Sequence, residues 1–236
     1  MTMQTLKTVG VGALCAALLA ACGGGGGDTP QTTNTTPGTS FALAAGYKAR
    51  VVDGATDTFN VAGDCTGTAT ISTAPSVAAA FEGVGGYSSA QVSTVNFTTC
   101  SLPSGVSTGT TYYTLSVLPI GLAIAGGEYA KFVVAPAVLP ATVKVGDSAV
   151  MVTMNSYADS TKVVPIGQRI VSYVIEADTT TTAIANIITR SYDLGGALLS
   201  TEQSRYRMAE SGALTRTSID VQFSTTSTVH LVFTRT

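Results

Sequence analysis

Residues 169–176 read Arg-Ile-Val-Ser-Tyr-Val-Ile-Glu, and this stretch decides the class of fold. Val171, Tyr173 and Ile175 occupy alternate positions, so in an extended chain their side chains share one face. β-branched and aromatic side chains suit a pleated, half-buried surface. The stretch therefore predicts a strand of an antiparallel sheet that has one dry face and one wet face.

A regular series of similar strands fills the C-terminal half of the chain. The expected strands are 148–157, 168–176, 184–192, 198–208, 214–223 and 228–235. Short, turn-forming links between them predict an antiparallel meander. In 214–223 the dry face is expected to hold Ile219, Val221 and Phe223, and the wet face Arg216, Ser218, Asp220 and Gln222. The dry face must be covered, and both a sandwich and an open or half barrel satisfy that need.

The region 41–125 is expected to form a smaller β subdomain before this meander. Its candidate strands are 47–52, 58–62, 65–72, 91–100 and 110–118. Ala74 to Gly83 could instead make one or two helical turns, because Pro75 suits a first turn and Gly83 a stop. Residues 119–127 interrupt the strand pattern, which places a soft boundary near 126 between subdomains 41–125 and 126–236. One continuous domain is the alternative.

The N-terminus has the layout of an export signal. Lys7 precedes an apolar run of eleven residues, Val9 to Leu19, whereas a membrane-spanning helix needs roughly 20. The sequence Leu19-Ala20-Ala21-Cys22 then resembles the lipobox of bacterial lipoproteins. The resemblance implies that residues 1–21 are a signal peptide and that Cys22 carries acyl chains such as palmitate. An ordinary cleaved signal followed by a chance cysteine is the alternative.

The residues after Cys22 predict a flexible tether. The tether is expected to comprise residues 22–40, of which residues 23–40 are rich in Gly, Thr and Pro and offer no apolar side chain to a core. Eighteen such residues span about 25 Å root-mean-square. Gly23 stands where many inner-membrane lipoproteins have Asp, so the start resembles the class destined for the outer membrane. The glycine run resembles that of uncharacterised β-rich envelope lipoproteins.

Two cysteines remain for the mature domain, Cys65 and Cys100. An exported protein meets an oxidising compartment, so a structural disulfide is expected. It would join the start of one strand to the end of a neighbouring strand. A redox pair normally has Cys-x-x-Cys spacing, and a metal site needs more ligands than a chain with one histidine supplies. No cofactor is expected.

Charge and composition exclude some classes of partner. The formal charge is 12 minus 14, or −2, and removing residues 1–21 takes away one Lys, which leaves −3. A nucleic-acid partner would need a clustered basic face, which a slightly acidic chain without a run of like charges does not provide. Nucleic acid is therefore not expected as a partner. Arg169, Arg190, Arg205 and Arg207 lie on neighbouring expected strands and could form a patch for an anion or a partner carboxylate. They could equally pair with Glu176, Glu202 or Asp220 across strands.

No complete catalytic set is present, and the chain is not expected to be an enzyme. Gly146-Asp147-Ser148 resembles the serine block of a class of secreted esterases, but His230 lacks the acidic partner which that class requires. The expected function is a membrane-anchored envelope module that binds a protein partner or has a structural role. The alternatives are a carrier of a hydrophobic ligand and a serine hydrolase using Ser148 and His230.

Overall fold

The computed structural model describes residues 39–100, 102–134, 136, 138–224 and 228–236. The expected signal peptide 1–21, Cys22 and the tether as far as residue 38 lie outside the described residues. Among the described residues, no helix is long and apolar enough to cross a membrane.

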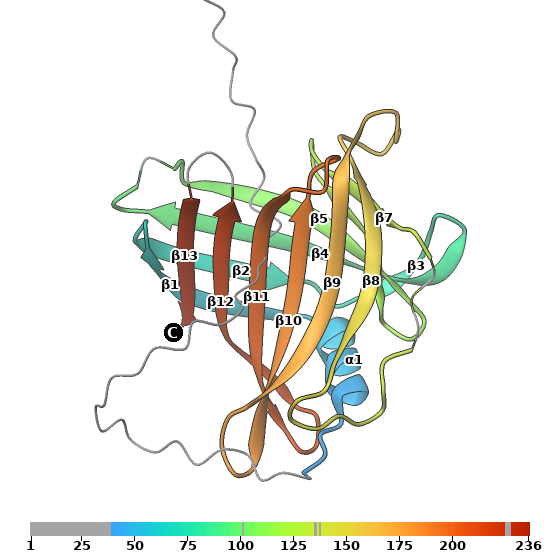
Figure 1. Cartoon of the computed structure of the whole chain (residues 1–236), viewed down its shortest axis with the longest axis vertical. Helices are drawn as coiled ribbons and strands as arrows, with labels where there is room; N and C mark the ends of the chain where they lie inside the picture. The colour runs from blue at the N-terminus through green and yellow to red at the C-terminus, as the bar shows by residue number, and fades with distance from the viewer. Residues whose placement is uncertain (1–38, 101, 135, 137, 225–227) are drawn as a thin grey trace, which may run out of the picture.

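The described chain folds into one helix followed by thirteen strands (Figure 1). The elements are α1 (Leu43–Asp53), β1 (Ala55–Gly63), β2 (Gly67–Thr73), β3 (Val77–Phe81), β4 (Val84–Phe97), β5 (Gly105–Thr114), β6 (Pro119–Ile124), β7 (Tyr129–Phe132), β8 (Ser148–Tyr157), β9 (Pro165–Ala177), β10 (Thr182–Tyr192), β11 (Leu198–Ala209), β12 (Leu214–Ser224) and β13 (Thr228–Arg235). The six strands β8 to β13 agree closely with the expected series, and the fold is all-β with antiparallel pairing as predicted.

The sheet closes on itself. Successive strands pair from β4 to β13, β13 pairs with β1, and β1 pairs with β2. A further pairing of β2 with β4 completes a ring of twelve strands, with β3 as the thirteenth strand outside it. The expectation of a sandwich or half barrel is therefore corrected: the sheet covers its dry face by closing into a barrel.

The expected boundary near residue 126 falls in the turn between β6 and β7. These two strands pair, with Leu122 opposite Ala130. The first strand of the expected N-terminal subdomain also pairs with the last strand of the meander, from Phe59 opposite Arg235 to Gly63 opposite Leu231. The regions 41–125 and 126–236 are thus neighbouring arcs of one sheet.

The segment 74–83 is extended, and the expectation of helical turns there is wrong. β4 is long enough to pair with β2 through Gln91–Phe97 and with β3 through Val84–Ser88. β2 and β3 therefore form two stretches of one strand line, broken around Pro75. Pro has no N–H to give to a ladder, so a break is where it is tolerated.

The β3–β4 hairpin extends beyond the ring and covers the outer face of β5, β6 and β7. Phe81 stacks on Tyr112, with ring centroids 4.3 Å apart, and lies 5.5 Å from Tyr129. A Cβ at Gly121 would lie 2.1 Å from the Phe81 ring, so glycine is needed for this contact. Residues 119–127, which are expected to interrupt the strands, instead contain β6. Pro119 is its first residue, and Gly121 leaves the space that the Phe81 ring of the hairpin occupies.

Glu82, at the tip of this hairpin, binds side chains of β7 and of the β8–β9 turn. Its carboxylate accepts hydrogen bonds from Lys131 Nζ at 2.8 Å, from Lys162 Nζ at 2.7 Å and from the Tyr129 hydroxyl at 2.7 Å. These bonds, led by that from Lys131, lower the pKa of Glu82 from 4.5 to about 2. The ion pairs hold β3 and β4 against β7 and the β8–β9 turn.

Replacing Glu82 by Gln should lower the free energy of unfolding by about 1–2 kcal/mol at pH 7. Because the folded pKa is depressed, the carboxylate's contribution is full above the unfolded pKa and is lost as pH falls from 4.5 toward 2. The difference in the free energy of unfolding between the wild type and Glu82→Gln, measured with urea, should therefore become smaller as the pH falls over that range. Glu210→Gln, at an exposed turn glutamate, is the control, with a change under about 0.5 kcal/mol. A gap independent of pH would contradict this account.

The helix α1 replaces the strand expected at 47–52. Its sequence, Leu-Ala-Ala-Gly-Tyr-Lys-Ala-Arg-Val-Val-Asp, is rich in good helix formers, and Arg50 lies in its last turn, where a cation suits the helix dipole. Gly54, with φ of 66°, follows the last helical residue and turns the chain into β1.

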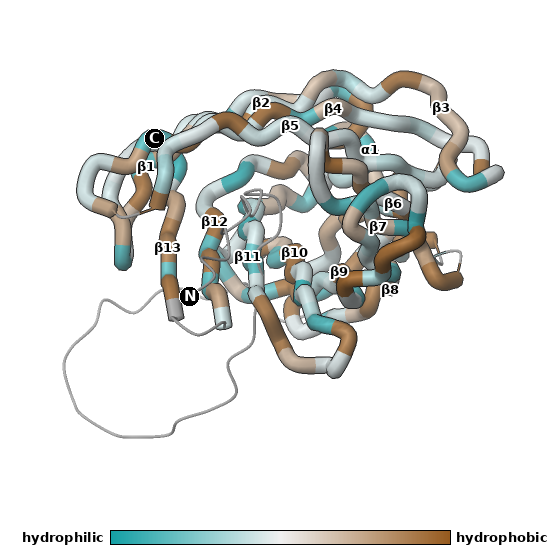
Figure 2. The backbone as a smooth tube through the Cα atoms, turned by 90° about the horizontal axis from the view of Figure 1, so that it is seen from above, coloured by the Kyte–Doolittle hydropathy of each residue, from teal (hydrophilic) through white to brown (hydrophobic). Residues whose placement is uncertain are grey.

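The helix lies inside the ring. Seen from above, α1 lies between the arc of β1, β2, β4 and β5 and the arc of β8 to β12 (Figure 2). A Cβ at Gly46 would lie 1.6 Å from the Gly212 carbonyl oxygen, so this glycine lets the helix approach the β11–β12 turn closely. Leu43 is fully buried in the apolar cluster that includes Ile175 and Met208.

Two apolar clusters fill part of the interior. The first surrounds α1 and includes Phe41, Leu43, Met154, Tyr173, Ile175 and Met208. The second lies under β1, β2, β12 and β13 and includes Phe59, Val61, Val95, Val221, Leu231 and Phe233. Val171, Tyr173 and Ile175 share the inner face as predicted, and so do Ile219 and Val221.

Candidate functional site

Polar side chains line the interior between the two apolar clusters. The register of β10 and β11 puts Thr189 opposite Glu202, and Ser191 opposite Ser200. These residues alternate with outward-facing ones, on the same face as buried Ala185 and Met208. On the facing arc of the ring, β4 and β5 turn inward Gln91, Ser93, Ser107 and Thr111. We call these inward-facing hydroxyl, amide and carboxyl side chains the polar lumen.

Part of the polar lumen is hollow. A pocket of about 30 Å³, partly open to solvent, lies against β4, β5 and β6. It is lined by Gln91, Ser93, Ser107, Gly109, Thr111, Leu122 and Ile124. Four of these seven residues carry a side-chain hydroxyl or amide, so the hollow offers hydrogen bonds as well as a small apolar wall.

A group of three arginines around one buried aspartate lies beside the polar lumen. Asp57 is 2% exposed and forms ion pairs with Arg50 of α1, with Arg216 at 3.4 Å and with Arg235 at 3.5 Å. We call these four residues the arginine hub. It ties the helix inside the ring to β1, β12 and β13.

Arg216 reaches the hub because of a register shift. The β11–β12 ladder shifts between Arg205 and Tyr206, so that Tyr206 faces Arg216 directly. The extra residue reverses the alternation on β12, and the expectation that Arg216 points outward with Asp220 is wrong. Its side chain is 10% exposed, and its Nε donates a hydrogen bond to the Tyr206 hydroxyl at 3.0 Å.

Tyrosine phenols surround the hub. The Arg50 and Arg216 guanidinium groups lie 5.9 Å and 5.1 Å from the Tyr206 ring centroid. Burial raises the pKa of Tyr47 well above its usual value and that of Tyr113 to about 12. Both phenols are therefore neutral at pH 7. Tyr113 also shares a hydrogen bond with Thr111, which lines the pocket, so the hub and the pocket are neighbours.

The four arginines expected as a patch do not share one surface. Arg169 faces inward with a 5% exposed side chain and pairs with Glu128 at 2.5 Å. Its alternation with Val171 and Tyr173 puts it on the dry face, and the ion pair with the partly buried Glu128 carboxylate makes that position tolerable. The expectation of a single patch that includes Arg169 is corrected.

The other three arginines lie on the outer face. Arg205 pairs with Glu176 at 3.2 Å, which is the cross-strand alternative, and Arg207 pairs with Asp178 at 2.7 Å. Arg190 and Asn186 are four positions apart on β10 and so share one face of the strand. Asn186 lies directly opposite Arg205 on β11, which puts Arg190 on the outer face as well. On this outer face, Arg205 and Arg207 are therefore held in ion pairs with carboxylates.

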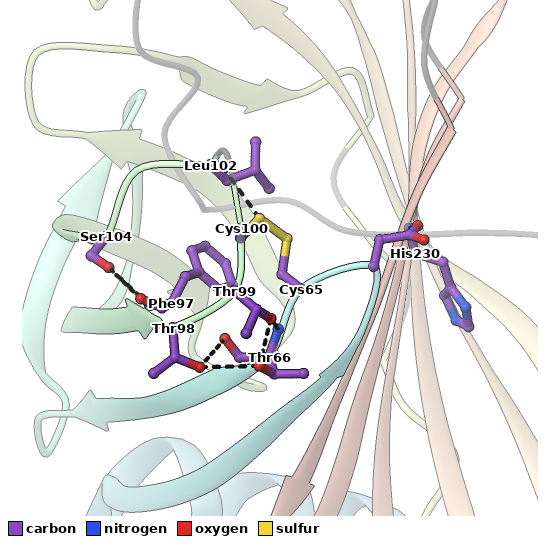
Figure 3. The surroundings of a disulfide bond; sticks show 10 residues. Cys65, Thr66, Phe97, Thr98, Thr99, Cys100, Leu102, Ser104 and His230 are labelled. Atoms are coloured by element: carbon purple, nitrogen blue, oxygen red, sulfur yellow. Dashed lines mark hydrogen bonds between the residues drawn. A yellow bond between two sulfur atoms is a disulfide. The ribbon is translucent and has the colours of Figure 1, made fainter.

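The disulfide between Cys65 and Cys100 is confirmed. Their Cα atoms are 4.9 Å apart, and the bond joins the β1–β2 turn to the β4–β5 loop (Figure 3). β2 and β4 are neighbours, with Gly67 opposite Phe97, so the bond links the ends of two paired strands as expected. Thr66 adds hydrogen bonds to Thr98 and Thr99 beside it.

Ser148 and His230 are not brought together. Ser148 begins β8 and His230 lies on β13, five strands away around the ring. Asp147 accepts a hydrogen bond from the Lys144 backbone N–H at 2.8 Å, so the Gly-Asp-Ser block forms a turn. The His230 side chain points away from the disulfide (Figure 3), on the outer face of β13. Its Nε2 lies 3.1 Å from Asp220 Oδ1. The pair therefore cannot act as nucleophile and base on one substrate.

The comparisons give no relative. No known protein family, curated protein or solved structure matches this chain. Within the part of the chain that the structure describes, no three His, Cys, Asp or Glu side chains are grouped so that they could hold a metal ion. The candidate site thus rests on the polar lumen and the arginine hub alone.

Proposed function

We propose that this protein is a lipid-anchored lipoprotein of the bacterial envelope whose barrel is a non-catalytic binding module for a small polar ligand. The anchor rests on the lipobox-like Leu19-Ala20-Ala21-Cys22, and the composition of residues 23–40 provides a tether of about 25 Å. The Gly23 that follows the cysteine supports the outer membrane as its location.

The polar lumen is the observation that carries the binding proposal. A ring of twelve strands is wider than the eight-stranded barrels whose interior side chains just fill, so its centre has room for a ligand. Here hydroxyl and amide groups of β4 and β5 line a small hollow, and further hydroxyl and carboxyl groups of β10 and β11 face the same interior. A hydrophobic ligand, the alternative for a carrier, would leave such groups without hydrogen bonds, so the lining favours a polar one.

Native mass spectrometry of the full-length protein, extracted gently from membranes, tests the ligand. We expect an added mass that denaturation releases. Ser107→Leu, which fills the pocket, should lose at least about nine-tenths of it, equivalent to a loss near 1.4 kcal/mol. Thr108→Leu, next in the chain but on the outer face of β5, is the matched control and should retain it. A wild-type protein without added mass, or equal loss in both variants, would overturn the proposal.

Replacing Cys22 by Ala tests the anchor. The variant should leave the membrane fraction or accumulate as an uncut precursor, because durable anchoring needs more than one acyl chain and Cys22 is their expected site. Fractionation with an antibody against the barrel measures this. Cys15→Ala, within the apolar run, should stay membrane-bound. Normal membrane retention of Cys22→Ala would defeat the lipoprotein assignment and leave the ligand proposal intact.

A further inference from the structure

The charges around the arginine hub do not balance. Arg50, Arg216 and Arg235 bring three positive charges to Asp57. Glu202 of the polar lumen lies within electrostatic reach of Arg216 and adds a second negative charge. Three minus two leaves one positive charge in excess. Solvent screens Arg235, which is 38% exposed, so the cost of the excess falls mainly on Arg216, whose side chain is 10% exposed.

Arg216 also has a free hydrogen-bond donor at this point. Its side chain is nine-tenths buried, yet its Nη1 has no hydrogen-bond acceptor among the described residues. The Asp57 oxygen 3.4 Å away contributes attraction without a hydrogen bond. A buried guanidinium N–H without an acceptor is unusual, because burying a polar group unpaired costs about 1–3 kcal/mol.

The hub is within reach of a ligand. Arg235, at the C-terminal end of β13, has a 38% exposed side chain, so the group is not sealed from solvent. On its other side, Tyr113 lies within electrostatic reach of Arg50 and Arg216 and shares a hydrogen bond with the pocket residue Thr111. A molecule in the polar lumen could therefore place a negative group against Arg216.

We infer that the polar lumen takes an oxyanion, a carboxylate or a phosphate group, which is bound by Arg216 with support from Arg50 and Arg235. Guanidinium groups match the geometry of both oxyanions. The inference rests on the proposed binding function and names the chemical class of its ligand. The anion supplies the missing negative charge and the acceptor for Arg216 Nη1, and the pocket side chains bind the rest of the molecule.

Isothermal titration of the full-length protein with sodium phosphate and, separately, with sodium succinate tests this inference. Sodium chloride at matched ionic strength serves as the reference. We expect saturable binding of at least one of the two oxyanions. The anion that binds more tightly tells whether the site recognises a phosphate or a carboxylate group. Arg216→Gln should weaken that binding about tenfold to a hundredfold. Arg207→Gln, at an outward-facing arginine paired with Asp178, should leave it unchanged.

A second variant keeps the test decisive if Arg216→Gln fails to fold. Arg235→Gln removes a half-exposed member of the hub at the chain end and should weaken the same binding severalfold. If neither oxyanion binds above the chloride reference, or if Arg216→Gln and Arg235→Gln both bind as the wild type does, the inference is wrong. A neutral mass retained from cells, together with no oxyanion binding, would overturn the inference but leave the binding function standing.

Discussion

Replacing both Cys65 and Cys100 by Ser is expected to lower the free energy of unfolding by about 4 kcal/mol. The bond closes a loop with a sequence separation of 35, and the chain-entropy model gives a loss of that size for such a loop. The bond also lies where the β1–β2 turn meets the β4–β5 loop, so its loss frees two turns at one end of the barrel.

Urea unfolding of the double variant and of the reduced wild-type protein measures this effect. Both should lose the same free energy, because both remove one covalent link and keep small side chains in its place. Ser104→Ala, which removes a hydroxyl that contacts the Phe97 backbone in the same loop, is the local control, with a loss of about 1 kcal/mol. If the double variant lost less free energy of unfolding than Ser104→Ala, the closed barrel would already hold the loop in place without the disulfide.

The strands from 148 onward could be predicted because each carries its own evidence. In 169–176 and in 214–223 the alternation is local, and short turns tell which strands are neighbours. Closure could not be predicted in the same way. It depends on β1 pairing with β13, between residues nearly the whole described chain apart, and no local pattern records that contact.

The errors have physical causes that are local to particular residues. The prediction of a strand at 47–52 is wrong because packing of α1 inside the ring outweighs the β preference of Val51 and Val52. The segment 119–127, predicted to interrupt the strands, contains β6, in which the Phe81 ring on the outer face requires Gly121 to have no side chain. Arg216 was placed outward because a bulge leaves no mark on a pattern of alternation.

The candidate site was missed, although one of its signals was present. Asp57 precedes Phe59 and Val61 at alternate positions, so the strand pattern already put a carboxylate on the dry face. A charge there calls for a partner, and the sequence offered no means to choose among the arginines. The partners come from α1, β12 and β13, which only the closed fold brings together.

Replacing Asp57 by Asn is expected to destabilise the fold by about 3–5 kcal/mol, because it leaves three arginines around a neutral amide. The amide keeps the size of the carboxylate, so the effect isolates charge from packing. Asp178→Asn, which breaks a more exposed pair with Arg207, is the control and should cost about 1 kcal/mol or less.

Removing one cation should restore part of the loss. The double variant Asp57→Asn with Arg235→Gln should be more stable than Asp57→Asn alone, since it lowers the uncompensated charge in the hub from three to two before Glu202 is counted. Urea unfolding of the four proteins of this cycle measures the coupling between the two residues. If Asp57→Asn cost no more than Asp178→Asn, Asp57 would not be the charge that holds α1 and the barrel wall together. Sodium phosphate should stabilise Asp57→Asn more than the wild type, because an added anion then replaces the charge that the substitution removed.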